Sequence, residues 1–326
     1  MASSEFRQHH SQLTTHHSLL LTIPSMYYLL YGLLYFFSLL PMRVLYILSD
    51  GIYVLLYYVF GYRRKVVMQN LLIAFPEKTE GERTVIAKKF YRNFLDTFVE
   101  IIKLISGSEA FFKKRIRGNW ELVNEVYKTG RSSQVNLGHT FNWEWANYMA
   151  SRELLYKFVV VYMPIKNKAV DKIFFKFRSK GGTGLVPATP PRAFIAGLAK
   201  YKSVKYMLTL AADQSPADPS KAYWLNFFGR PTAFVTGPEK GARLHNLPVF
   251  FCNITKPRRG YYDIHFTFIE ENPALTKEGE LTVRFARFLE ENIRHYPDMW
   301  LWSHRRWKRE WKQEYRELWI DKDFPD

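Results

Sequence analysis

The stretch VNLGHTFNWEW (135–145) passes from a β-like run through a turn into a helix. The apolar run ends at Gly138, and His139 follows in the turn. Asn142 is a residue type that caps helices, and the expected helix begins at Trp143. A strand that leads directly into a helix is the repeating unit of α/β folds. The stretch therefore predicts that His139 lies in a turn between a strand and a helix.

The same alternation continues along the chain. Short β-like runs are expected at residues 134–137, 158–162, 206–210, 249–254 and 261–268, and helices at residues 143–151, 170–180, 192–201 and 238–244. Thr79 with Glu82 forms a capping box for a long amphipathic helix that ends near Gly107, and Thr236 with Glu239 forms a second box. We therefore predict an α/β fold, a mostly parallel mixed sheet flanked by helices, with 261–268 as an antiparallel addition.

Composition limits the partners. The 326 residues carry a formal net charge of +17, so anionic partners are expected, and nucleic acid and acidic phospholipid both qualify. The aromatic content of 17% favours a membrane interface, with stacking on RNA bases as the alternative. The single cysteine, Cys252, excludes an intramolecular disulfide and a Cys-rich zinc site. We predict no metal and no cofactor.

The N-terminal part divides into two regions. Residues 1–25 hold four of the nine histidines without any period, and we interpret them as a disordered leader, which leaves Met1 and Met26 as alternative starts. From residue 27 to residue 62 the only formal charges are Arg43 and Asp50. Residues 26–62 are therefore predicted to be a hydrophobic anchor with interfacial helices, followed by one α/β domain at 63–326.

Pro41 separates two apolar runs in the anchor, 27–40 and 44–62. Neither is a clean span, because an aspartate at mid-bilayer costs about 2.5–3.5 kcal/mol on insertion scales. We expect the first run to anchor the protein and the second to lie in the interface or to pack on the domain. The basic residues 63–65 indicate that this side faces the cytoplasm. A secretory signal is disfavoured, because no basic start and no small-residue cleavage site are present.

His139 and Glu144 are the expected catalytic pair. Residues five apart lie far around a continuous helix, so the two can meet only if His139 is in the turn and Glu144 in the first helical turn. The carboxylate would hold one ring nitrogen, and the other nitrogen would take a proton from a substrate hydroxyl. The pattern HxxxxE by itself is weak, since a histidine in a turn is more often structural.

Four blocks, in this order, extend the pattern: NLGHTFNWEW (136–145), KIFFKFRSKGGTGLVP (172–187), the pair AADQSP (211–216) and NFFGRPTAFVTGPEKGAR (226–243), and YPDMWLWSHRRWK (296–308). With them the chain resembles the lipid A biosynthesis (lauroyl/myristoyl) acyltransferase family of the lysophospholipid acyltransferase superfamily, over roughly residues 27–312. Glu144, where the glycerolipid branch typically has aspartate, points to the lipid A branch. The resemblance implies an inner-membrane enzyme that faces the cytoplasm. It would transfer acyl chains from acyl carrier protein to a hydroxyl of a phosphorylated lipid A precursor.

The resemblance also implies substrate-binding residues. Arg178 would bind a phosphate of the acceptor or of the carrier's phosphopantetheine, although a surface arginine is the plain alternative. Asp213 and Gln214 follow the expected strand 206–210, and Asp213 would orient Arg178 or the acceptor, or only form a turn. Gly229 and Arg230 would shape the acyl or acceptor pocket.

Other functions remain open at this point. The same residues would serve an acyltransferase that acts on a lysophospholipid, an aminolipid or a glycolipid. A hydrolase is disfavoured, because no GxSxG motif is present. A basic membrane-tethered protein that binds nucleic acid would leave the apolar region unexplained, so no nucleic acid is expected. The tail SHRRWKREWKQEYRELW (303–319) is interpreted as a helix at the membrane surface, with a packed helix and an RNA-binding segment as alternatives.

Overall fold

The computed structural model describes residues 26–322, and the leader predicted at 1–25 lies outside the described residues. The core is a seven-stranded sheet in the order β1-β9-β8-β2-β5-β3-β4. Its strands are β1 (Ile116–Gly118), β2 (Ser133–Leu137), β3 (Lys157–Tyr162), β4 (Gly184–Pro187), β5 (Tyr206–Ala211), β8 (Val249–Arg258) and β9 (Tyr261–Glu270). Only β8 and β9 pair antiparallel, and every other neighbouring pair is parallel. The predicted α/β class with one antiparallel addition is confirmed.

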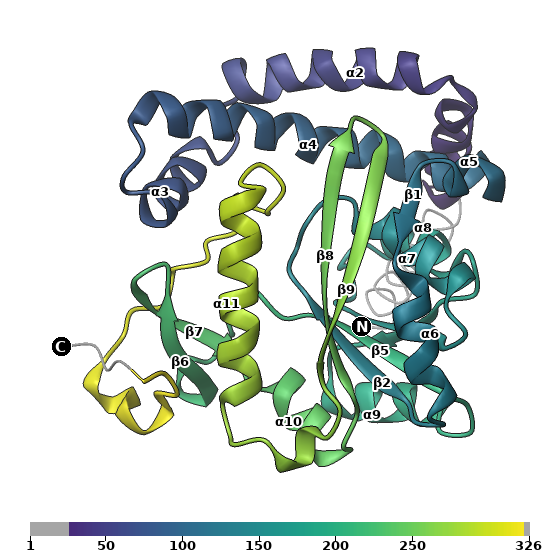
Figure 1. The fold of residues 1–326 in the computed structure, drawn as a ribbon. Helices are drawn as coiled ribbons and strands as arrows, with labels where there is room; N and C mark the ends of the chain where they lie inside the picture. The colour runs from purple at the N-terminus through teal and green to yellow at the C-terminus, as the bar shows by residue number, and fades with distance from the viewer. Residues whose placement is uncertain (1–25, 323–326) are drawn as a thin grey trace, which may run out of the picture.

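Helices cover the sheet on both faces (Figure 1). The helices that follow the N-terminal region are α3 (Arg64–Ala74), α4 (Glu80–Ser106), α5 (Glu109–Lys113), α6 (Trp120–Lys128), α7 (Trp143–Glu153), α8 (Lys168–Ser179), α9 (Pro191–Ala199), α10 (Gly237–Leu244) and α11 (Glu280–His295). Phe251 of β8 contacts Phe285 of α11. Tyr262 of β9 points to the opposite face and contacts Trp145 of α7. Helices α11 and α7 therefore pack on opposite sides of the sheet.

The capping predictions have different outcomes. Helix α4 begins with the predicted box, in which Thr79 and Glu82 cap each other, and Gly107 is its C-cap. The second predicted box is wrong, because the Thr236 side chain caps nothing in α10. The buried carboxylate of Glu239 instead accepts hydrogen bonds from the backbone of Gly279 and Thr282 at the start of α11. Glu239 therefore satisfies free N–H groups of another helix.

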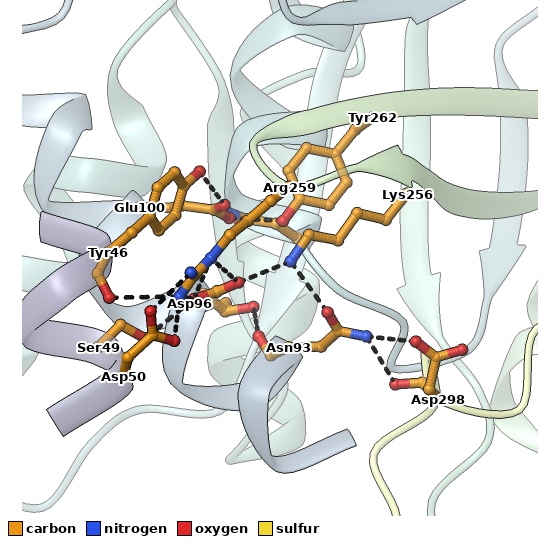
Figure 2. Close-up of polar contacts among 12 residues, drawn as sticks. Tyr46, Ser49, Asp50, Asn93, Asp96, Glu100, Lys256, Arg259, Tyr262 and Asp298 are labelled. Atoms are coloured by element: carbon orange, nitrogen blue, oxygen red, sulfur yellow. Dashed lines mark hydrogen bonds and ion pairs between the residues drawn. The ribbon is translucent and has the colours of Figure 1, made fainter. Parts of the chain in front are cut away.

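The apolar N-terminal region forms a helix at Met26–Leu39, then α2 (Met42–Val54), which continues as the π-helix η1 (Leu55–Val59). By length and composition alone, Met42–Val59 could cross a membrane. Helix α2 lies along α4 above the turn of the β8–β9 hairpin (Figure 1). The Arg259 guanidinium of that hairpin lies between two carboxylates, Asp50 of α2 and Asp96 of α4 (Figure 2). The aspartate in the apolar run is therefore a docking residue.

A two-stranded sheet of β6 (Ala222–Phe227) and β7 (Arg230–Val235) stands beside α11. The tail packs against it through the rings of Trp311 and Tyr315 on Trp224. Within the tail the regular structure is a single 3-10 turn, η4 (Gln313–Leu318). The predicted helix at the membrane surface is therefore wrong, because the indole rings bury themselves against the small sheet.

Candidate active site

His139 lies in the turn between β2 and α7, as predicted. The Asn142 side chain accepts a hydrogen bond from the Trp145 amide and caps α7. Gly138 fits where no side chain could, because a Cβ there would stand 2.7 Å from Leu289 Cδ1 and 3.4 Å from Asp213 Oδ2. The glycine thus allows α11 and Asp213 to approach the backbone beside His139.

Asp213 lies immediately beside His139 because β5 is the parallel neighbour of β2. The Ala212 amide donates to the Leu137 carbonyl (3.0 Å), which continues the pairing just past the strand ends. Asp213 Oδ1 lies 2.5 Å from His139 Nδ1, and Oδ2 accepts from the His139 backbone N–H (2.8 Å) and from the Trp300 indole (2.7 Å). The carboxylate is 2% exposed, so these three donors provide its solvation.

The electrostatics of this pair favour a charged carboxylate. Burial opposes ionisation of Asp213, but the His139 ring and the hydrogen bonds from His139 and Trp300 lower its pKa to about 2. Burial also opposes protonation of His139, yet Asp213 outweighs it and raises the pKa of the ring, against a smaller opposing effect from Arg178. The pair is therefore built to stabilise an imidazolium when the ring accepts a proton.

The second ring nitrogen can act as a base once the Gln214 amide is displaced. With Nδ1–H donating to Asp213, His139 Nε2 carries the lone pair. The side-chain amide of Gln214 lies 3.0 Å from Nε2. The ring is 21% exposed, whereas Asp213 is closed off. A hydroxyl that displaces the Gln214 amide would meet this lone pair directly.

Glu144 does not hold the His139 ring, so the predicted pairing of these two residues is wrong. Its carboxylate is 2% exposed and accepts from Arg178 Nε at 2.8 Å and from the Trp143 indole at 3.2 Å. Glu144 lies in the first turn of α7 as expected, but its side chain faces α8, which carries Arg178. Asp213 takes the place that was predicted for Glu144, because the parallel neighbour strand ends directly beside the histidine.

Arg178 is consequently held by one nitrogen only. Nε donates to Glu144, and within residues 26–322 neither terminal nitrogen has a hydrogen-bond partner. The side chain is 19% exposed and lies close enough to His139 to lower the pKa of the ring. The terminal nitrogens of the guanidinium are thus available for an anionic or carbonyl oxygen near the histidine.

The C-terminal segment closes the site, and the sequence did not reveal its role. Trp300 forms a bridge with Thr140 and donates to Asp213, and the Leu301 amide donates to the His139 carbonyl. His304 Nε2 accepts from the Ser215 amide (3.2 Å), and burial beside Arg306 lowers the His304 pKa to about 4. Trp300 and His304 belong to the block 296–308. The family resemblance includes this block, but it does not predict these contacts.

The remaining predicted residues lie outside this cluster. Gly229 adopts φ +69° in the turn between β6 and β7, and the exposed Arg230 begins β7. No hydrogen bond or ion pair joins either of them to His139 among the described residues. Their place in a substrate pocket stays a prediction. Within residues 26–322, no three His, Cys, Asp or Glu side chains lie close enough together to bind a metal ion.

A buried aspartate that holds a histidine at the carboxyl edge of a parallel sheet is a general-base arrangement, typical of enzymes that activate a nucleophile. Comparison with protein families identifies which kind. Residues 14–309 match the bacterial lipid A biosynthesis acyltransferases, and the chain belongs to this family. It is therefore an enzyme that transfers acyl groups. Curated proteins contain no match to the chain.

Proposed function

We propose that the protein transfers a fatty acyl chain from acyl carrier protein to a hydroxyl of a phosphorylated lipid A precursor, in the late acylation of lipid A. The observation that carries the proposal is His139, with Nδ1 fixed by buried Asp213 and with Nε2 available. The family match supports both the reaction and the class of acceptor.

The reaction follows from this geometry. The acceptor hydroxyl displaces the Gln214 amide and gives its proton to His139 Nε2, while its oxygen bonds to the carbonyl carbon of the acyl thioester. Asp213 stabilises the imidazolium that forms. The carbon–sulfur bond then breaks, and the imidazolium returns the proton to the leaving thiolate. The products are an ester and a free thiol, and the enzyme regains a neutral histidine without a covalent intermediate.

Arg178 supplies the binding of negative charge. Glu144 fixes the guanidinium through Nε, which leaves the terminal nitrogens to grip a phosphate of the acceptor or of the carrier's prosthetic group. Since Glu144 is buried, its charge also keeps Arg178 from being an uncompensated cation beside the catalytic histidine. We assign to Glu144 the positioning of Arg178 in place of the positioning of His139.

Acyl transfer in vitro tests the proposal. The full chain in lipid vesicles, with acyl-acyl carrier protein and a lipid A precursor, should yield a product heavier by one acyl group in mass spectrometry. His139→Ala should lower the rate by about 10²–10⁴-fold in a protein that still folds and melts cooperatively. His265, exposed on β9, provides the matched control, and His265→Ala should keep full activity.

Two results would contradict the proposal in different ways. Normal transfer by His139→Ala would remove the mechanism. Transfer only to a lysophospholipid, an aminolipid or a glycolipid would keep the mechanism and replace the acceptor.

A further inference from the structure

The N-terminal helices expose many large apolar side chains, and we call the surface that carries them the N-terminal apolar face. Its exposed residues are Tyr28, Leu29, Leu33, Tyr35, Phe36, Leu39, Val44, Ile47, Leu48, Ile52, Val54, Leu55, Tyr58, Val59 and Phe60. They come from the helix Met26–Leu39, from α2, from η1 and from its C-cap Phe60, and α2 and η1 run along the top of the molecule (Figure 1). An exposed apolar surface of this extent marks a site of interaction with a partner or a membrane.

The other side of α2 and η1 carries polar groups and aromatic rings that contact charged side chains of α4. One contact in each turn joins the two antiparallel helices: the Tyr46 hydroxyl donates to Glu100, the Ser49 hydroxyl to Asp96, and the cations of Arg92 and Lys88 lie over the rings of Tyr53 and Tyr57. The partners on α4 are four residues apart and form a stripe of ionisable side chains, part of which is visible in Figure 2. This stripe accompanies α2 and η1 along their length.

The turn between the two N-terminal helices is tied down as well. The carbonyl oxygen of buried Ser38 accepts from Lys103 Nζ and from the Ser106 hydroxyl, each at 2.6 Å, at the end of α4. Further along α2, Arg259 binds Asp50 with two nitrogens. The helices are therefore held against the domain by polar contacts at several points.

These contacts limit how α2 can be oriented relative to a lipid bilayer. At 1.5 Å per residue, the 18 residues Met42–Val59 measure about 27 Å, close to the thickness of a bilayer core. If α2 stood across a bilayer, the stripe at 88–100 and the Arg259 cluster would be carried through the whole hydrocarbon depth. Ionisable side chains are expensive there, and the cost rises with each one. In this fold α2 can only lie flat.

We propose that the N-terminal apolar face lies in the plane of a single bilayer leaflet that contains anionic lipids, and that no helix of residues 26–322 crosses the membrane. The positive charges around the face favour a membrane that contains anionic lipids. Exposed cations stand at the start of α2, at Arg43, and just beyond the end of η1, at residues 63–65. In a flat orientation they lie at the level of the lipid phosphates, while the apolar side chains enter the acyl region.

This orientation also places the active site. Phe141, in the catalytic turn, packs against Phe90 and Phe94 on α4, the helix along which α2 lies. Arg63, at the edge of the face, donates to the Ser303 carbonyl in the segment that closes the site (3.0 Å). An acceptor lipid would thus reach His139 from the leaflet in which the protein lies. This last step rests on the proposed function, whereas the binding itself does not.

Cysteine labelling separates the flat orientation from a spanning one. The native Cys252 is buried, so the parent protein should not react with a membrane-impermeant maleimide. In sealed vesicles, Arg43→Cys and Lys65→Cys should react from the same side, and Gly51→Cys, on the outer side of α2 with open space around its Cβ, should react only after detergent is added. Labelling of residues 43 and 65 from opposite sides would overturn the proposal, and so would labelling of residue 51 in intact vesicles.

Vesicle flotation tests whether a lipid membrane binds the N-terminal apolar face. Ile47 on the face is 70% exposed, and Leu244 at the far end of α10 is 79% exposed, so the two form a matched pair. Ile47→Asp should weaken binding to vesicles that contain phosphatidylglycerol on the order of tenfold, while Leu244→Asp should bind like the parent. Unchanged flotation of Ile47→Asp would overturn the proposal. If that variant instead turns a dimer into a monomer, the face belongs to a second copy. Neither readout depends on catalysis, so each can fail while acyl transfer is intact.

Discussion

Replacing Asp213 with asparagine tests which carboxylate supports His139. The amide keeps the shape of the side chain and can still accept from the His139 amide and the Trp300 indole, but it carries no charge to stabilise an imidazolium. Two unit charges at about 4 Å with an effective dielectric constant of about 20 interact by about 4 kcal/mol. That corresponds to about 10³-fold in rate. The same change in serine hydrolases costs about 10⁴-fold, so we expect a loss between these two values.

The pH dependence of the reaction makes this prediction specific. Asp213 raises the pKa of His139 against the opposing effect of burial, and base catalysis requires the neutral ring. Without Asp213 the pKa of the ring falls, so the acidic limb of kcat/KM should move to lower pH while the plateau drops. Glu144→Gln acts through Arg178, so it should mainly raise KM for the phosphorylated acceptor. Both variants are measured by acyl transfer from labelled acyl-acyl carrier protein, beside thermal melting.

The opposite pattern would refute the reasoning. If Asp213→Asn transfers within about threefold of the parent while Glu144→Gln loses about 10³-fold, then Glu144 holds the ring in the working enzyme. The double variant His139→Ala/Asp213→Asn gives a second check. Its defect should be no larger than that of His139→Ala, because the two residues act as one base.

Three further outcomes are expected. Arg178→Lys keeps the charge but loses the planar fork, so kcat/KM for the phosphorylated acceptor should fall about 5- to 160-fold, the equivalent of about 1–3 kcal/mol, and unchanged kinetics would remove Arg178 from the site. Gly138→Ala forces a Cβ onto Leu289 and toward Asp213, so it should destabilise the fold by about 1–3 kcal/mol and impair transfer, whereas Gly237→Ala, with open space around its Cβ, should do neither. Ionised Asp213, with its pKa lowered from 3.8 to about 2, stabilises the fold above pH 3.8, and this stability is lost as pH falls through about 2. Protonated His139, with its raised pKa, adds stability below pH 6.5 that is lost as pH rises through the raised value. The melting difference between the parent and Asp213→Asn should therefore be largest between pH 3.8 and 6.5, and a difference independent of pH would exclude this linkage.

The sequence predicted the α/β class because the alternation of short apolar runs with helical periods is a local property. It did not predict β1, β4 or the β6–β7 hairpin, which are short or contain proline, as β4 does at Pro187 and β7 at Pro231. Helix α11 has a local signal in the sequence. Its buried residues Leu281, Phe285, Leu289 and Ile293 stand four apart, as on one face of a helix.

The catalytic pair shows why a site is harder to predict than a fold. His139 and Asp213 are 74 residues apart, and they meet because β5 inserts next to β2 while β3 lies beyond it. Strand order is set by long-range packing, and no local pattern contains it. Glu144 was the nearest carboxylate in the sequence, so reasoning from spacing selected it. The sequence predicts where both strands end, but not that the two strands are neighbours in the sheet.

The N-terminal region was limited by the same kind of missing information. Hydropathy averages all faces of a helix, so Met42–Val59 has the composition of a spanning segment. One side of that helix carries Tyr46 and Ser49, whose hydroxyl groups bond to carboxylates of α4. Tyrosine and serine count as only mildly polar in such an average, yet here their hydroxyl groups lie on the side that faces the domain. Since the polar partners lie on α4, only the pairing of two helices distinguishes a helix that lies in a leaflet from one that crosses it. The position of Asp50 was the one local hint, because an acidic residue inside an apolar run needs a cation, and Arg259 supplies it from the hairpin 209 residues further along the chain.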